Sequence, residues 1–182
     1  MAFNINDIRA QMTGGGARSN LFQVELPLPP AIAGGDAVAA SQKLTFTCRS
    51  TIFPGSTVTS IPVPYFGRTV NFAGTRTFEE WSVTVLNDED FLVYDAINAW
   101  SNSINTHEGN LRASGPNPNS YQASADVVQF GKRGDEIKRI TLVNLWPASI
   151  QQMDLSWDAA DAIQDFSVSW VYDYWVNAGV TS

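Results

Sequence analysis

The chain has 182 residues, of which 44% are hydrophobic and 16% are charged, values typical of one globular domain rather than two. Its formal net charge of -7 argues against tight, general binding to nucleic acid, which needs clustered Lys and Arg side chains. No apolar run is long enough to cross a bilayer, and the first residues lack the basic end and apolar centre of a signal peptide. Cys48 is the only cysteine, so no internal disulfide is possible, and we expect a protein made and used in a cytoplasm.

The first part of the chain combines flexible segments with one strand. Residues 5–12 have a short helical pattern followed by three consecutive glycines, which predicts a mobile N-terminal arm over residues 1–20. Residues 21–26 alternate apolar and polar side chains and are followed by prolines, which predicts a first strand. Residues 27–42 are mostly small and include two adjacent glycines, which predicts an inserted flexible loop.

Residues 43–49 and 57–68 are predicted to pair as a β-hairpin around turn residues 53–56. The second segment is rich in apolar side chains, but its two prolines cannot donate hydrogen bonds to a ladder. We therefore expect it to lie at a sheet edge or against another surface, where exposed apolar side chains indicate a partner. The candidate subunit-interface residues are Phe53, Pro54, Gly55, Ile61, Val63, Pro64, Tyr65, Phe66, Gly67 and Arg68.

Cys48 falls on the apolar face that Leu44 and Phe46 would share in the first strand of this predicted hairpin. Cysteine in such a position usually behaves as a small hydrophobic residue. We therefore expect a buried, inert thiol rather than a nucleophile.

Residues 76–90 are predicted to form a strand that runs directly into a helix. Trp81, Val83 and Val85 alternate with polar residues, as in a half-buried strand, and the apolar residues beyond them follow the helical period. The acidic run at residues 87–90 is expected to cap the helix, whose first amide hydrogens are unpaired. A calcium site is disfavoured because the run lacks alternating oxygen donors and a glycine turn.

His107 is the only histidine and is predicted to lie near the end of this helix, with Gly109 in a left-handed cap just beyond it. It has no second imidazole with which to bind a metal and no adjacent nucleophile to activate. A structural role is therefore the preferred interpretation.

The C-terminal third is predicted to contain three strands. Residues 121–130 and 136–146 form a hairpin whose basic tip is more typical of a solvated, mixed-charge turn than of a phosphate site. Residues 166–175 carry an aromatic ladder, which is more often sheet core than a ligand platform. The aspartates between these strands are not expected to bind metal, and residues 176–182 are expected to form a C-terminal tail.

Together these elements predict a mainly β domain, either a β-barrel or two packed antiparallel sheets, with one flanking α-helix. The apolar, proline-bearing edge segments have to be covered, and closure into a ring would cover them. A head-to-tail interface that closes produces such a ring.

The longest distinctive segment is AGTRTFEEWSVTVLNDEDF, at residues 73–91. Shorter motifs are Phe66-Gly67-Arg68, Asn144-Leu145-Trp146-Pro147, Leu155-Ser156-Trp157-Asp158 and Tyr172-Asp173-Tyr174-Trp175. In their order and spacing, from residue 20 to residue 175, these segments resemble the tail tube proteins of contractile-tailed, T-even-type bacteriophages. The predicted loop at residues 27–42 departs from that family, in which the first two strands are joined more directly.

The resemblance implies a phage tail-tube fold, in which each subunit contributes strands to a continuous inner barrel while the helix lies outside it. It implies a structural virion protein that forms hexameric rings, stacked into the inner tube of the contractile tail, with assembly in the host cytoplasm. The implied partners are other copies of the chain, the tail sheath, baseplate and tail terminator proteins, the tape measure protein, and phage DNA that passes without tight binding. No membrane insertion, enzymatic activity, cofactor or metal is implied.

An acidic bore is also expected, because the chain has 18 acidic and 11 basic residues and the family implies that DNA passes through the tube. We expect residues 43–65 and 121–146 to supply its polar lining. Repulsion between like charges would keep the polymer free to slide.

Three alternatives remain at this point. A tube from a secretion or injection system derived from phage tails would carry protein instead of DNA. A carbohydrate-binding β-sandwich would expose some of the six Trp and five Tyr residues as stacking surfaces. A hydrolase is disfavoured because the sequence contains no nucleophile elbow and no metal-ligand cluster.

Overall fold

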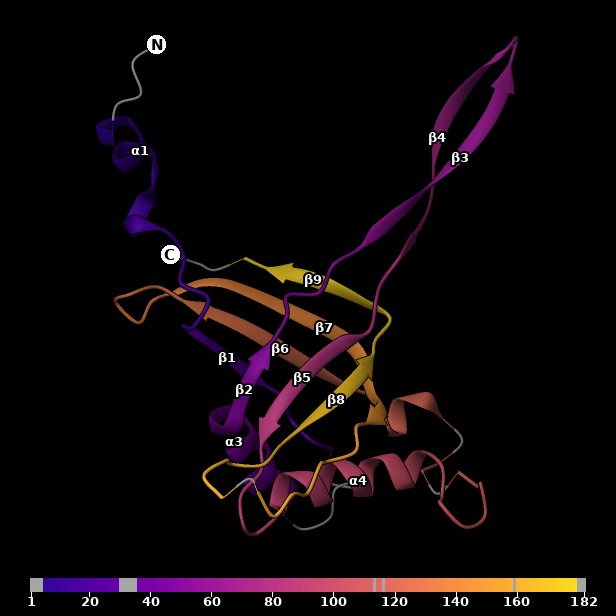
Figure 1. Ribbon diagram of the computed structural model, residues 1–182. Helices are drawn as coiled ribbons and strands as arrows, with labels where there is room; N and C mark the ends of the chain where they lie inside the picture. Colours follow the sequence, from indigo (N-terminus) through magenta and orange to yellow (C-terminus); the bar gives the residue numbers. More distant parts are fainter. Residues whose placement is uncertain (1–4, 30–35, 113, 116, 159, 180–182) are drawn as a thin grey trace.

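A computed structural model describes residues 5–29, 36–112, 114–115, 117–158 and 160–179 (Figure 1). Parts of the predicted arm, inserted loop and C-terminal tail, at residues 1–4, 30–35 and 180–182, lie outside the described residues. The helices are α1 (Ile5–Gln11), α3 (Ala37–Thr47) and α4 (Leu92–Ile104), with 3-10 helices η1 (Thr13–Gly15) and η2 (Pro118–Ser120). The strands are β1 (Phe22–Glu25), β2 (Cys48–Thr51), β3 (Thr57–Tyr65), β4 (Arg68–Thr77), β5 (Trp81–Leu86), β6 (Ala123–Phe130), β7 (Glu136–Ile150), β8 (Asp165–Val171) and β9 (Tyr174–Ala178).

Seven strands form one antiparallel sheet in the order β1-β6-β7-β8-β5-β2, and β9 also pairs with β7. The 15-residue strand β7 belongs to both halves of this sheet: Arg139–Val143 pairs with β9, whereas Trp146–Ile150 pairs with β8. Between these two stretches Asn144 has a positive φ of 59°, which interrupts the regular strand. We call β1, β6, the first part of β7 and β9 the first leaflet, and the second part of β7, β8, β5 and β2 the second leaflet.

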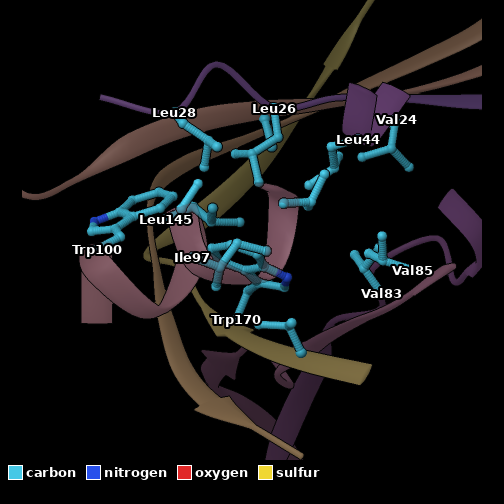
Figure 2. Close-up of a cluster of buried hydrophobic side chains, with 14 of the residues drawn as sticks. Val24, Leu26, Leu28, Leu44, Val83, Val85, Ile97, Trp100, Leu145 and Trp170 are labelled. Atoms are coloured by element: carbon cyan, nitrogen blue, oxygen red, sulfur yellow. The ribbon is translucent and has the colours of Figure 1, made fainter. Parts of the chain in front are cut away.

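The core lies between the two leaflets and the helices α3 and α4 (Figure 2). Alternate residues of β5 and β8 point into it, and Trp170 packs against Trp81 and Trp100 with ring centroids 6.4 and 5.4 Å apart. The amphipathic helix α4 contributes Val93, Ala96, Ile97 and Trp100. The predicted mainly β fold with a flanking helix is confirmed, and the strand-to-helix transition from β5 to α4 lies where the change of period predicted it.

The helix α3 corrects two predictions, because residues 37–42 are not a loop and residues 43–47 are not a strand. Ala37, Ala40 and Leu44 are buried at helical spacing against the core, whereas Phe46 is 86% exposed. Threonine favours strands because it is branched at Cβ. In α3 the hydroxyls of Thr45 and Thr47 donate hydrogen bonds of 3.0 Å to the carbonyl oxygens four residues earlier, those of Ser41 and Lys43.

The strands β3 and β4 form a separate two-stranded sheet that projects from the body of the molecule (Figure 1). The predicted pairing of residues 43–49 with residues 57–68 is therefore wrong, because β3 pairs with the segment that follows it. The chain reverses at Phe66 and Gly67, whose φ values of 41° and 78° are both positive, as tight hairpin turns require.

The last predicted strand is divided in two. Phe166, Val168, Trp170 and Tyr172 are buried as predicted, but the aromatic ladder ends there, and Tyr174 is 45% exposed at the start of β9. The division allows β8 to complete the second leaflet and β9 to add to the first.

Beyond α4, the left-handed conformation belongs to Asn110 and not to Gly109. His107 lies three residues after the last residue of the helix, where its backbone N–H donates to the Asn102 side chain at 3.0 Å.

Candidate assembly surfaces

The projecting hairpin has one apolar face. Cross-strand neighbours share a face in an antiparallel pair, so Ile61 and Phe72 lie together, as do Val63 and Val70. Every residue of β3 is exposed. At the tip, Phe66 is 91% exposed and its ring meets Tyr65 edge-on, with centroids 4.7 Å apart.

The predicted interface residues divide between the two ends of this hairpin. Ile61, Val63, Pro64, Tyr65, Phe66, Gly67 and Arg68 occupy its outer half, whereas Phe53, Pro54 and Gly55 lie where the chain leaves the body, at the root. Pro54 is buried, so it is not part of an exposed surface. The sequence prediction missed the β4 half of the apolar face, although the alternation of Val70 and Phe72 with polar residues was a usable signal.

Three strands of the seven-stranded sheet have an unpaired edge within the described part of the chain. The strand β1 pairs only with β6, β9 only with β7, and β2 only with β5. A groove of about 640 Å³ runs beside β1 and β2 and includes the exposed Phe46 of α3. Unpaired strand edges are templates for further pairing, so β1 and β9 make the first leaflet extendable on both sides.

The face of the first leaflet that points away from the core carries a charged cluster centred on Arg139. Its guanidinium contacts Asp126 at 2.7 Å, Glu136 at 2.8 Å and Glu25 at 2.9 Å. Asp126 also accepts a hydrogen bond of 2.5 Å from Thr141. The hydrogen bond from Arg139, followed by its positive charge, lowers the pKa of Glu136. Three carboxylates against one guanidinium leave this cluster with a negative net charge.

The acidic run before α4 does not supply the N-cap residue, which is Phe91 with a positive φ of 52° and no capping hydrogen bond from its side chain, but Asp90 satisfies the first N–H of the helix. The Asp90 carboxylate accepts the Leu92 backbone N–H at 3.1 Å, whereas Asp88 accepts that of Glu89. Lys43 of α3 bridges both aspartates, at 2.7 Å from Asp88 and 2.5 Å from Asp90. Hydrogen bonds from Lys43 lower the pKa values of both carboxylates.

The described residues contain no group of three or more His, Cys, Asp or Glu side chains arranged to hold a metal ion. Cys48 is only partly buried, and desolvation raises the pKa of its thiol to about 12, which disfavours the nucleophilic thiolate. No described helix is long and apolar enough to span a membrane. Trp81, Trp100 and Trp170 are buried in the core, which removes them as stacking surfaces for a carbohydrate, whereas Trp157 is fully exposed.

Comparisons with known proteins agree with this arrangement. The family model described as phage tail tube protein matches residues 17–178. Tail tube protein gp19 of Enterobacteria phage T4 is 36% identical over 173 residues, which cover 94% of this chain and 98% of that protein. The tail tube protein of Serratia phage KSP90 is 28% identical over 165 residues, which cover 90% of each chain.

Solved structures share the fold at low sequence identity. A chain of the sheath–tube complex of PVC, an extracellular contractile injection system, matches with a TM-score of 0.57 at 12% identity, covering 98% of this chain and 100% of that chain. A chain of the PVC sheath/tube terminator structure matches with a TM-score of 0.62 at 11% identity, covering 90% and 97%. The resemblance that the sequence motifs indicated is confirmed, and the chain belongs to the phage tail tube protein family.

Proposed function

We propose that this protein assembles into hexameric rings, which stack to form the inner tube of a contractile phage tail and conduct DNA into the host. The observation that carries the proposal is the first leaflet, in which β1 and β9 are unpaired edges on opposite sides. Strand direction alternates from β1 through β6 and β7 to β9. The β9 strand of one copy would therefore run antiparallel to β1 of the next, and repetition of this contact closes a ring.

In such a ring the face of the first leaflet that carries Arg139 and its carboxylates would line the bore. Its negative cluster supports the expectation that DNA passes without being gripped, because like charges repel. The helix α4 would lie outside, toward the tail sheath. Baseplate and tail terminator proteins would meet the two ends of the tube, and the tape measure protein would occupy the bore before DNA. The role is structural, in the virion, after assembly in the host cytoplasm.

The apolar face of the β3–β4 hairpin is proposed as the contact between stacked rings. An isolated two-stranded hairpin is only marginally stable in water, and its exposed apolar side chains have no cover in the single subunit. Burial against the next ring would supply that cover.

Negative-stain microscopy of the purified protein tests the proposal directly, with rings or tubes as the expected result. The double variant Val63→Asp/Val70→Asp places charges on the apolar face of the hairpin and is expected to form rings that do not stack. The matched control Thr69→Asp/Asn71→Asp adds the same charge on the opposite face and should stack more readily. Monomers at every concentration of the unaltered protein would contradict the proposal.

Hydrogen exchange gives a second test. Amides of residues 57–77 should exchange quickly in the isolated subunit and become protected in tubes, because stacking orders the hairpin. Strong protection in the monomer would argue against its assignment as the stacking element.

A tube of an injection system is the second candidate, supported by the shared fold with chains from PVC structures. The two candidates differ in cargo. Tubes attached to DNA-filled particles in infected cells would favour the phage tail, whereas tubes filled with protein would favour the injection system.

A further inference from the structure

The direction of the β3–β4 hairpin is determined at its root. Within the described residues, β3 and β4 pair only with each other, so no other strand steadies them. A nine-residue strand is about 30 Å long, and a rotation of about 10° at one end moves the other by about 5 Å. Small changes at the root therefore decide whether the tip reaches a given surface.

Two indole groups hold the incoming side of this root, which is the segment that leads from β2 into β3. Trp81 donates its Nε1–H to the Ile52 carbonyl at 2.9 Å, and Trp175 donates its Nε1–H to the Gly55 carbonyl at 3.2 Å. The two tryptophans belong to different parts of the molecule. Trp81 is fully buried in β5, in the middle of the second leaflet, whereas Trp175 is half-buried in β9, at the edge of the first leaflet.

The remaining contacts at the root do not replace this link to β9. Arg76 donates to the Ser56 hydroxyl at 2.5 Å, which joins the two sides of the hairpin to each other. Phe78 packs against Tyr172 of the body with centroids 6.0 Å apart, and this contact fixes the outgoing side. Rotation of the hairpin about this outgoing attachment is opposed at Gly55 by Trp175.

We propose that Trp175 is a positioning residue that couples ring closure to the direction of the hairpin. The residues on either side of it, Tyr174 and Val176, are 45% and 43% exposed along the unpaired edge of β9. Pairing of that edge with the next subunit holds β9 in place, and the Trp175 indole transmits this constraint to Gly55. In free subunits the hairpin swings, and in a closed ring all hairpins point the same way. Rings therefore close before they stack. The inference rests on the ring closure proposed above.

The test compares Trp175→Phe, which keeps an aromatic ring but loses the N–H donor, with Trp146→Phe. Trp146 is a half-buried residue of β7 whose indole makes no hydrogen bond in the part of the chain described by the structure. Sedimentation measures ring formation and microscopy measures stacking. We expect Trp175→Phe to form rings as the unaltered protein does, but with a yield of tubes at least about tenfold lower, because all hairpins of a ring must engage together. Trp146→Phe should match the unaltered protein in both.

A distance measurement separates positioning from a general loss of stability. Spin labels at Thr69→Cys near the tip and Ala99→Cys on α4, in a Cys48→Ser background, report the hairpin direction when labelled subunits are diluted into unlabelled ones. The distance distribution should be broad in monomers, narrow in rings, and broad in Trp175→Phe rings.

The failure of this inference differs from failure of the proposed function. Absence of rings from the unaltered protein would count against the proposed function itself. Normal stacking by Trp175→Phe would overturn the coupling alone. A failure of Trp175→Phe to form rings would overturn it as well, because Trp175 would then act in lateral closure. Equal distance distributions in monomers and rings would also overturn the coupling.

Discussion

Single charged side chains add connections between elements beyond those of the backbone ladders. Arg139 reaches from β7 to carboxylates on β1 and β6, and Lys43 joins α3 to the residues that precede α4. Each exposed ion pair contributes less than about 1 kcal/mol. Arg139 is the stronger connection, because its side chain is only 24% exposed and three partners share it.

Replacement of Arg139 by Gln is expected to lower the free energy of unfolding by about 1–2 kcal/mol, because three carboxylates lose their cation together. Urea unfolding followed by fluorescence measures this change. Lys138→Gln is the control, since it removes the neighbouring positive charge of the same strand without breaking the cluster. Equal effects of the two variants would show that the cluster adds nothing beyond net charge.

Acid sensitivity follows from the depressed pKa of Glu136. A carboxyl group whose pKa is lowered by folding adds stability above its usual pKa of 4.5, and this stability is lost as the pH falls through the lower, folded value. The melting temperature of the unaltered protein should therefore decrease below pH 4.5, and Arg139→Gln should show a smaller decrease. Parallel pH profiles for the two proteins would exclude this contribution.

At the scale of elements, the sequence correctly predicted the strands in which apolar residues alternate with polar ones and the apolar residues are the buried ones. The strand β5 and the hairpin of β6 and β7 are of this kind. The helix α3 was missed because residues 43–49 alternate as a strand does and include two threonines. Local pattern could not reveal that Leu44 would meet the core one helical turn from Ala40, since that choice depends on distant parts of the chain.

The sequence located the projecting hairpin only in part, because the strongest local turn signal does not lie at its turn. Pro54 and Gly55 are a strong turn signal, but they lie at its root, whereas the actual turn is Phe66-Gly67. A phenylalanine with positive φ is uncommon, so no turn rule pointed to it. The prolines and apolar residues of β3 nevertheless predicted correctly that this strand is exposed.

Alanine substitutions distinguish the helix from the predicted strand. Leu44→Ala is expected to lower the free energy of unfolding by about 2–4 kcal/mol, because Leu44 is 1% exposed within the core. Phe46→Ala should change it by less than about 0.5 kcal/mol, because Phe46 is 86% exposed. In a strand the two residues would share a face. Similar losses for both variants, measured by thermal or urea unfolding, would favour the strand.

For the whole molecule, the distribution of charge would decide how a polymer passes through the proposed bore. The first leaflet shows its negative cluster on the face opposite the core, while the chain contains no Lys or Arg after Arg139. A bore built from this face would repel phosphate groups at low salt, and this repulsion would weaken as salt screens the charges.

Cations added to this face should convert free passage into binding. Gln23→Lys/Ser124→Lys adds two cations on the Arg139 side of the first leaflet, and tubes of this variant should retain DNA at low salt and release it as salt increases. The control Gln151→Lys/Gln152→Lys adds the same charge to the exposed connection between β7 and β8. Retention measured by co-sedimentation should be weaker for the control. Equal retention would place the proposed bore on another face.

The two prolines of β3 have a consequence for subunits that await assembly. Pro62 and Pro64 pair with Asn71 and Thr69, so their donor-free nitrogens fall on the outer side of β3, along the edge that β4 does not cover. A passing strand cannot extend the hairpin there, because two successive amide hydrogens are missing from that edge. The hairpin can therefore adhere through its side chains while resisting growth into fibrils. In the proposed assembly, this edge would leave the apolar face of each free subunit available for stacking while blocking strand-by-strand growth.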